Sequence, residues 1–297
     1  MTAAPRMPGP DVQVPTRMLV EALVRADLTV DTGELYATAN LLGMTDQQVR
    51  LCIKRLVAEG RFTHEGRGRK ALLRAAGTTE QTMGLDVEFV AHAFRQDAGI
   101  APWDGTWHLV AFAVPETART ARDALRVALT RLGGASIQGG LYLSANPWEP
   151  YVENHARHLN ILDHLTFATT RDLRQGDQDD PAALARALWP LAELAELYHR
   201  LTAVAQLRRE RLHDHAGLSE PQRLTIAVEL AAEFTRIMEA DPLLPPQLLP
   251  QPWPGTQARA LVAQCWSLLD ESAGPDGENI RLFRLYGDMT RPAAART

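Results

Sequence analysis

Between residues 32 and 74, apolar and polar residues follow a pattern that predicts two short helices, a tight turn and a hairpin. The first helix is expected from about residue 33 to 42, and Gly43 is the left-handed residue that ends it. The second helix starts with a capping box, because Thr45 can cap it and Gln48 follows three residues later. Two helices around a turn, followed by a hairpin, form the order of a winged helix-turn-helix, which predicts DNA binding.

The second helix of this stretch presents two different faces. One face is apolar and is expected to be buried, with Val49, Ile53, Leu56 and Val57 at helical spacing. The other face suits a major groove, where amides and guanidinium groups read base edges and apolar atoms meet thymine methyls. The candidate DNA-contacting residues of this helix and its cap are Thr45, Gln47, Gln48, Arg50, Leu51, Lys54 and Arg55.

The predicted hairpin carries a basic tip. Arg67, Arg69 and Lys70 lie there beside glycines and are expected to contact phosphates, which positions a protein on DNA without reading its sequence. For the helix face, the alternative is an amphipathic helix with a few solvated charges. The turn, the capping box and the basic hairpin together favour DNA binding over that alternative.

The middle of the chain alternates between strand and helix patterns. The expected elements are a strand over 107–114, a helix over 117–132, strands over 135–137 and 141–144, a helix over 148–159 and a strand over 164–170. This order, βαββαβ, predicts a ferredoxin-like sandwich. Beyond it the pattern is helical, with helices expected over 182–214, 219–240 and 256–271.

These elements predict an α+β protein of several domains. The N-terminal winged helix-turn-helix is expected over 15–77, after a disordered arm over 1–14. A linker helix and turn over 78–104 lead to the central ferredoxin-like domain over 105–172, and an all-helical C-terminal domain follows over 181–288. With 297 residues, of which 45% are hydrophobic, the chain is long enough to fill several cores.

Charge separates the predicted DNA-binding part from the rest of the chain. Residues 45–74 contain eight Lys and Arg against three Asp and Glu, a net charge of +5. Because the whole chain carries −5, the remaining residues carry −10. A basic module on an acidic body fits a regulator better than a general nucleic-acid coat protein.

Neither a membrane span nor a disulfide framework is predicted. The sequence has no apolar run long enough to cross a bilayer, and its Pro-rich start lacks the apolar core of a signal peptide, so we expect a cytoplasmic protein. Cys52 and Cys265 are too few for a disulfide framework or a metal site, and both are expected to be small buried hydrophobic residues.

Several short motifs follow one another along the chain. They are PWDGTW at 102–107, LG at 132–133, GLYLS at 140–144, DPLLP at 241–245 and WPG at 253–255. With the predicted winged helix, this order resembles the PaaX family of repressors, named for control of phenylacetic acid degradation, from about Pro15 to Leu269. The resemblance implies a winged-helix domain, a Cas2-like middle domain and a helical C-terminal domain. It also implies a homodimer that represses a catabolic or biosynthetic operon, bound to operator DNA until a small effector releases it. That effector is phenylacetyl-CoA in the best-known members.

Three arginines of the helix expected over 117–132 are the candidate contacts for such an effector. Arg119, Arg122 and Arg126 share one face at i, i+3 and i+7, where they could clamp the phosphates of an acyl-CoA. The Arg-x-x-Arg spacing also belongs to the family pattern. The alternative is a solvated helix face whose arginines pair with Asp123 or Glu116.

The helix expected over 182–214 carries an aromatic stripe. Trp189 and Tyr198 lie in this stripe and are expected to belong to the core, with Tyr198 and His199 as a candidate wall of a pocket. In the effector hypothesis, the helix that bears Trp189 and Tyr198 supplies the apolar wall beside the arginines.

An enzyme and an effector-independent DNA-binding protein are the alternative functions. A Cas2-type nuclease would place an aspartate near the end of the first strand, where this chain has the apolar run 112–115. The sequence contains no phosphate loop, dinucleotide fingerprint or Gly-x-Ser-x-Gly motif. The HDH run at 213–215 lacks further ligands at a convincing spacing for a metal. We therefore expect no catalytic residue, cofactor or metal, with a metal-dependent nuclease or an acyl-CoA hydrolase as the enzyme alternative.

Overall fold

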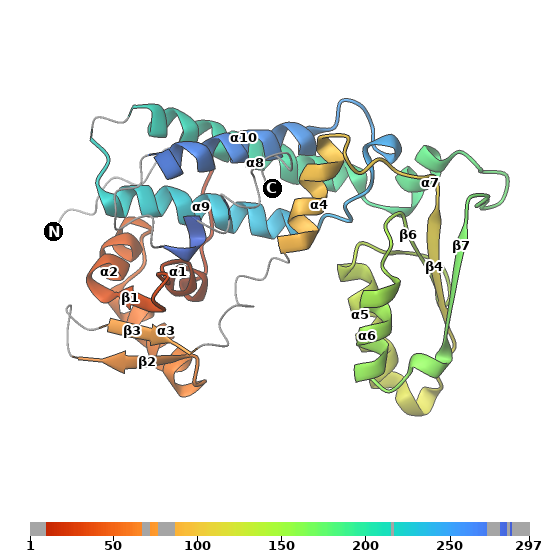
Figure 1. The fold of residues 1–297 in the computed structure, drawn as a ribbon, viewed down its shortest axis with the longest axis horizontal. Helices are drawn as coiled ribbons and strands as arrows, with labels where there is room; N and C mark the ends of the chain where they lie inside the picture. The colour runs from red at the N-terminus through yellow and green to blue at the C-terminus, as the bar shows by residue number, and fades with distance from the viewer. Residues whose placement is uncertain are drawn as a thin grey trace. The chain divides into compact units, whose positions relative to one another are not determined.

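A computed structural model gives the fold and describes residues 10–66, 72–76, 87–214, 217–271, 280–283 and 286. The fold is of the mixed α+β class and divides into two compact units. The first unit takes its described residues from 1–94, 198–236 and 255–297, and the second takes them from 95–197 and 237–254. Figure 1 labels most of the helices and strands of both units along the ribbon.

The N-terminal part of the first unit, residues 16–75, is a small α+β arrangement that we call the N-terminal module. Its described elements are α1 (Thr16–Ala22), β1 (Thr29–Asp31), α2 (Thr32–Leu41), α3 (Asp46–Ala58), β2 (Phe62–Glu65) and β3 (Leu72–Ala75). The strands form an antiparallel sheet with β3 in the middle, in the order β1-β3-β2. The two predicted helices and the two predicted hairpin strands are all present.

Local sequence signals set the ends of α2 and α3. The side chain of Asp31 caps α2 by accepting a hydrogen bond from the amide of Glu34 at 2.9 Å. Gly43 has a φ of 76°, a left-handed conformation that glycine adopts without strain and that ends the helix. At the start of α3, the Gln48 amide donates to Thr45 Oγ1 at 3.2 Å, and the Thr45 amide donates to Gln48 Oε1 at 2.7 Å. The predicted capping box is therefore confirmed.

Helix α3 packs its apolar face against α1, α2 and β2. Val49, Ile53 and Leu56 are buried there, as their spacing predicts. The prediction that Val57 is buried with them is wrong, because its side chain is 37% exposed. Successive residues of a helix are about 100° apart, so Val57 lies at the border of the stripe, about 80° around the helix from Val49.

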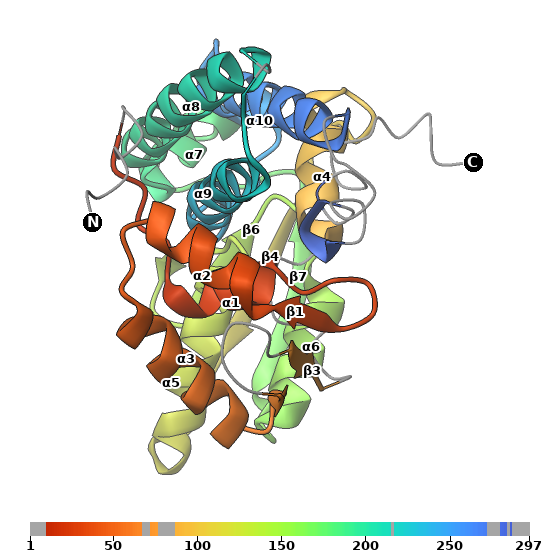
Figure 2. The same ribbon diagram turned by 90° about the vertical axis from the view of Figure 1, so that its left-hand side faces the viewer.

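The rest of the first unit is helical. Its long helices are α8 (Leu191–His213), α9 (Glu220–Met238) and α10 (Pro254–Glu271). Residues 224–235 of α9 are all buried, and Figure 2 shows α9 between the pair α8 and α10 on one side and the N-terminal module on the other. Arg208 of α8 and Glu229 of α9 form a buried ion pair at 2.8 Å. Helix α9 is therefore the core element of this unit.

A C-terminal segment connects the N-terminal module with these helices. Ile280 forms a β-bridge with Arg25, and the amide of Arg281 donates to the carbonyl of Val24 at 2.9 Å. Tyr286 stacks on Trp266 of α10, with 4.3 Å between the ring centroids. The segment therefore contacts both parts of the first unit by main-chain and aromatic contacts.

The prediction of a single helix over 182–214 is wrong in one respect. It is two helices, α7 (Pro181–Leu188) and α8, separated at Trp189 and Pro190. Trp189 has an extended backbone, which is the conformation favoured before a proline, and Pro190 has no amide to continue the helical hydrogen bonds. Trp189 therefore does not share a helix with Tyr198, contrary to our expectation.

The second unit contains the predicted βαββαβ arrangement. Its elements are β4 (Trp107–Phe112), α5 (Arg119–Arg131), β5 (Ala135–Gln138), β6 (Leu141–Ser144), α6 (Glu149–His158) and β7 (Leu165–Thr170). All pairings are antiparallel, and the strand order β5-β6-β4-β7 is that of a ferredoxin-like sandwich. Helices α5 and α6 pack on one sheet face over a core that includes Val110, Leu125, Leu129 and Val152. The predicted linker helix is α4 (Val87–Asp97), most of which belongs to the first unit.

Two distant motifs meet in the second unit. Gly133 has a φ of 83°, and a Cβ atom there would lie 2.6 Å from the carbonyl oxygen of Pro242. Asn146 Nδ2 and Gln96 Nε2 both donate to the carbonyl of Leu243, at 2.8 and 3.1 Å. The LG motif at 132–133 and the DPLLP motif at 241–245 are therefore in contact, and this close approach requires glycine at position 133.

Candidate DNA-binding surface

The exposed side of α3 forms a polar strip with one apolar residue near its centre. Gln47, Leu51, Lys54 and Ala58 lie opposite the buried residues of the helix, and all four are exposed. Leu51 is 49% exposed. At about 100° per residue, these four positions lie within about 50° of the direction opposite the buried stripe, which gives the helix a single outward surface.

The cations of this strip lack acidic partners within the described part of the chain. Lys54 and Arg55 are exposed and form no hydrogen bond or ion pair with another described residue. Arg50 uses its Nε to donate to the main-chain carbonyl of Asp46 at 3.3 Å and forms no ion pair with a described carboxylate. A protein surface with unpaired positive charge attracts nucleic acid, whose backbone is negatively charged.

Other arginines of the N-terminal module are neutralised by nearby carboxylates. Arg74 pairs with Glu65 at 3.2 Å across the hairpin. Arg61, at the start of the hairpin, lies 3.4 Å from Glu21 of α1. Because these charges are satisfied within the module, its free positive charge in the described residues is concentrated on α3.

Thr45 and Gln48 hold the start of α3. Their side chains form the capping box, so the Thr45 hydroxyl and the Gln48 carbonyl oxygen are engaged with main-chain amides. Both residues lie at the exposed N-terminal end of the helix. The structure therefore gives each of them a structural role at the edge of the strip.

The three predicted phosphate contacts of the hairpin tip, Arg67, Arg69 and Lys70, lie outside the described residues.

An ion-pair cluster that the sequence reasoning missed orients α3 against α1. Arg17 lies 3.1 Å from both Glu21 and Glu59, the latter at the end of α3, while Arg61, just before β2, lies 3.4 Å from Glu21. Burial raises the pKa of Glu21, and its two arginine partners lower it only in part. The i, i+4 spacing of Arg17 and Glu21 was the available sequence signal. Cys52 of α3, which was expected to be buried, is half-buried, and its burial raises the pKa of the thiol.

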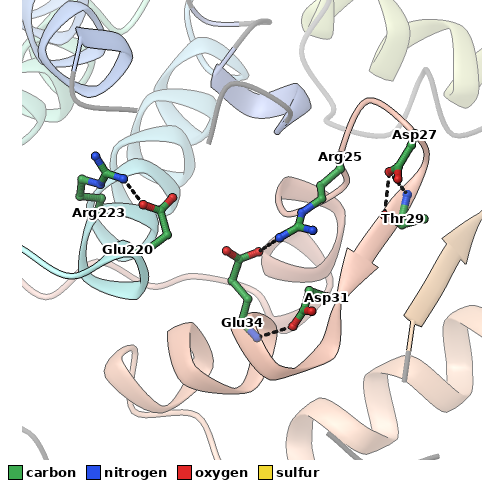
Figure 3. A network of polar contacts seen from close by, with 7 residues as sticks. All are labelled: Arg25, Asp27, Thr29, Asp31, Glu34, Glu220 and Arg223. Atoms are coloured by element: carbon green, nitrogen blue, oxygen red, sulfur yellow. Dashed lines mark hydrogen bonds and ion pairs between the residues drawn. The ribbon is translucent and has the colours of Figure 1, made fainter. Parts of the chain in front are cut away.

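Two separate ion pairs lie at the first turn of α2 and at the first turn of α9. Arg25 and Glu34 form an ion pair at 3.2 Å, and Glu220 and Arg223 form one at the first turn of α9 (Figure 3). Burial is the largest cause that raises the pKa of Glu34, Arg25 opposes it, and the charge of Glu220 adds to it. Figure 3 also shows the separate contact of Asp27 with Thr29, whose hydroxyl lies 2.6 Å from the carboxylate. The like charge of Glu220 at the first turn of α9 therefore opposes the ionisation of Glu34 in the N-terminal module.

The three candidate effector arginines lie on α5, and each has a partner within the second unit. Arg119 lies 3.7 Å from Asp123 and 3.9 Å from Glu116. Arg122 donates to Glu116 at 2.8 Å. Arg126 lies over the ring of Phe112, 5.9 Å from its centroid. The paired helix face that we gave as the alternative is thus present for Arg119 and Arg122.

The aromatic candidates are core residues of different units. Trp189 is buried in the second unit, stacks on Trp107 and donates its indole N–H to the carbonyl of Gly133 at 2.9 Å. Tyr198 is fully buried in the first unit, where its hydroxyl accepts a hydrogen bond from Arg259 at 2.6 Å. His199 is exposed. The expectation that Trp189 and Tyr198 belong to the core is confirmed.

An open cavity of about 480 Å³, which no sequence pattern indicated, lies at one end of the ferredoxin-like sheet. Its lining is mostly small or apolar, with three polar side chains, and comprises Ala111, Phe112, Ala113, Gln138, Gly139, Gly140, Leu141, His164 and Thr166. None of these residues is a carboxylate or a cysteine. Across the described residues, no group of three or more His, Cys, Asp and Glu side chains is placed to hold a metal ion.

Comparison with known proteins gives matches in the central and C-terminal parts of the chain. Residues 100–184 match the family described as the PaaX protein central Cas2-like domain, and residues 189–275 match the PaaX-like protein C-terminal domain. A solved structure of an uncharacterized protein, Rv0674 from Mycobacterium tuberculosis, is 24% identical, with 80% of this chain and 89% of that chain covered and a TM-score of 0.46. No curated protein sequence matches the chain. Among the described helices, none is long and apolar enough to cross a membrane.

Proposed function

The chain belongs to the PaaX family, whose members regulate transcription, and we propose that it is a repressor that binds operator DNA through α3. The observation that carries the proposal is the exposed strip of α3, whose cations have no acidic partner among the described residues and lie beside an amide, on a helix whose other face is buried. In this proposal the strip enters the major groove, where Gln47, Lys54 and Arg55 donate to base edges or phosphates.

The surrounding elements support a winged helix-turn-helix. Helices α2 and α3 are separated by a short turn at Gly43, and an antiparallel hairpin follows α3. In such modules the second helix enters the groove and the hairpin follows the DNA backbone. We propose that Arg67, Arg69 and Lys70 at the hairpin tip contact phosphates.

We propose that the repressor acts as a homodimer on an inverted repeat. A single helix reads only a few base pairs, which is too little to find one operator among the competing sites of a genome. Two modules related by a twofold axis double the sequence that is read, with half-sites about one or two helical turns apart. Light scattering, with and without operator DNA, measures this state, and a monomer at micromolar concentration would exclude it.

We further propose that a small effector, such as an aryl- or acyl-CoA, releases the repressor. An effector can do so only by binding the DNA-incompetent conformation more tightly than the competent one. The arginines of α5 are the proposed phosphate contacts, and effector phosphates would have to replace Glu116 or Asp123 as their partners. The exposed His199 is a further proposed contact, whereas the burial of Trp189 and Tyr198 leaves them a supporting role.

The central test compares matched single-charge variants in quantitative DNA binding. An operator-like duplex is selected from a random library with the intact protein, and its affinity is measured at several salt concentrations. We expect Lys54→Ala and Arg55→Ala to lower affinity for the selected duplex, and each lost phosphate contact to reduce the salt slope by about one.

Arg157→Ala is the matched control, because Arg157 is an exposed arginine of α6 in the second unit. This control should leave both quantities unchanged. Equal behaviour of the three variants, or no duplex preferred over random DNA, would contradict the proposal.

Incubation of the protein with DNA and with acyl-CoA thioesters tests the enzyme alternative by turnover. Binding that no small molecule alters would favour the effector-independent alternative.

A further inference from the structure

Leu51 occupies an unusual place on the proposed DNA-binding helix. It is among the large hydrophobic residues left exposed, at 49%, and it lies almost opposite the buried Val49 and Leu56. Gln47 precedes it by four residues and Lys54 follows by three, so both lie beside it on the same face. A large apolar side chain thus stands between an amide donor and a cationic donor.

Packing within the N-terminal module does not account for this position. Val49, Ile53 and Leu56 already supply the buried face of α3, and Leu51 points away from them. A singly exposed leucine is ordinary on a protein surface. Here, however, the flanking donors Lys54 and Arg55 also lack acidic partners among the described residues. A ligand for this strip therefore needs acceptors on its flanks and an apolar group at its centre.

The major-groove edge of DNA offers that combination at one kind of base pair. Thymine projects a methyl group into the groove, and a neighbouring guanine presents the N7 and O6 acceptors, whereas adenine presents the N7 acceptor. Four residues of helix span about 6 Å and three span about 4.5 Å. With a base-pair rise of 3.4 Å in each strand, Gln47 and Lys54 would meet bases one or two steps from the thymine.

From this arrangement we propose that Leu51 is a specificity-determining residue that packs on a thymine methyl at the centre of each operator half-site. This inference rests on the proposed DNA binding by α3 and adds the base that the helix selects. The proposal assigns Leu51 no role in stability, because its side chain is exposed and takes no part in the buried face of α3.

The experiment removes the methyl from the DNA and the leucine from the protein, separately and together. Each thymine of the selected duplex is replaced in turn by deoxyuridine, which differs only in the missing methyl. For the parent protein we expect one or two positions per half-site where affinity falls about fourfold, the effect of one methyl group returned to water. Leu51→Ala should bind the unmodified duplex more weakly, and at those same positions deoxyuridine should have no further effect.

A matched control keeps the test specific to Leu51. Val57→Ala removes an exposed apolar side chain from the same helix, at 37% exposure and about 120° away from Leu51. It should retain the full response to deoxyuridine. Unchanged melting temperatures of both variants show that the fold is intact, and alanine is a favourable helix residue at an exposed position.

The outcomes separate this inference from the proposed function. If no thymine is sensitive, or if Leu51→Ala keeps the sensitivity of the parent, Leu51 does not read a methyl. DNA binding that still depends on Lys54 and Arg55 would then leave the proposed function standing. If the protein selects no duplex at all, both proposals fail.

Discussion

Helices α3 and α5 both carry basic side chains at helical spacing, yet the surroundings of those side chains differ. On α5, Arg119 and Arg122 are paired with the carboxylates of Glu116 and Asp123. On α3, Lys54 and Arg55 have no such partner in the described part of the chain. The spacing of basic residues is therefore the same for a helix face whose charges are paired and for one whose charges are available to a ligand. The positions of nearby acidic residues distinguish the two.

The two helices also differ in how they begin. Helix α3 has a complete capping box, whereas the N-cap residue of α5 is Ala118, whose side chain makes no cap hydrogen bond. A capped first turn holds its exposed side chains in fixed directions, which direct base reading needs. Helix α5 instead begins after a short 3-10 helix, η3 (Glu116–Ala118), that brings Glu116 to its arginines.

Charge reversal should show the largest difference between the two helices. We expect Lys54→Glu with Arg55→Glu to lower operator affinity at least about a hundredfold, because two contacts are lost and two repulsions are added. The equivalent pair on α5, Arg119→Glu with Arg126→Glu, should change operator affinity less than about threefold under the same salt conditions. Fluorescence anisotropy with the selected duplex measures both, and a similar loss in the two variants would refute the distinction drawn here.

Neutral substitution on α5 sharpens the comparison from the other side. We expect Arg119→Ala with Arg122→Ala to bind operator normally but to need at least about tenfold more effector for release, because bidentate phosphate contacts are lost. Titration of the protein–DNA complex with phenylacetyl-CoA measures the response. A Glu153→Ala variant, which removes an exposed carboxylate of α6, serves as the control. If release by the effector survives unchanged, the α5 arginines serve only their ion pairs.

The caps should differ by a smaller amount. Thr45→Ala is expected to reduce the free energy of unfolding by about 1 kcal/mol, because it removes the acceptor for the Gln48 amide. Ala118→Ser is expected to raise it by up to about 1 kcal/mol by providing the cap that α5 lacks. Urea unfolding followed by circular dichroism gives both values. Equal and negligible changes would mean that the cap of α3 is not what holds its first turn.

The smallest expected effect is a pH dependence at Glu21, which orients α3. Burial raises the pKa of Glu21 in the folded protein above its ordinary value. The folded state therefore binds this proton more tightly, and the resulting stabilisation is fully present below the unfolded pKa of about 4.3. It is lost as the pH rises through the folded pKa.

Unfolding of the parent and of Glu21→Gln between about pH 4 and pH 7 measures this effect. The stability of the parent relative to the variant should decrease as the pH rises. Glu65→Gln, which alters an exposed carboxylate of the hairpin, is the matched control and should show no comparable trend. A relative stability of the parent that increases with pH would show that the arginine partners outweigh burial.

Most of the secondary structure could be predicted because its signals are local. The capping box, the turn at Gly43 and the βαββαβ order depend on residues a few positions apart, and all three are present. The prediction of one helix over 182–214 failed although the signal was also local, because Pro190 interrupts a helical pattern that continues on both sides of it.

The capped helix α3, its two faces and the family motifs could all be read from the amino-acid sequence, because each depends on a spacing along the chain. Which charges on those faces are paired depends instead on contacts between residues far apart along the chain. Glu21 reaches Arg61 across forty positions, and Gly133 meets Pro242 across more than a hundred. Likewise, Trp189 and Tyr198 lie nine positions apart yet belong to the cores of different units. Such pairings follow from the way elements pack, which the local alternation of apolar and polar residues does not encode.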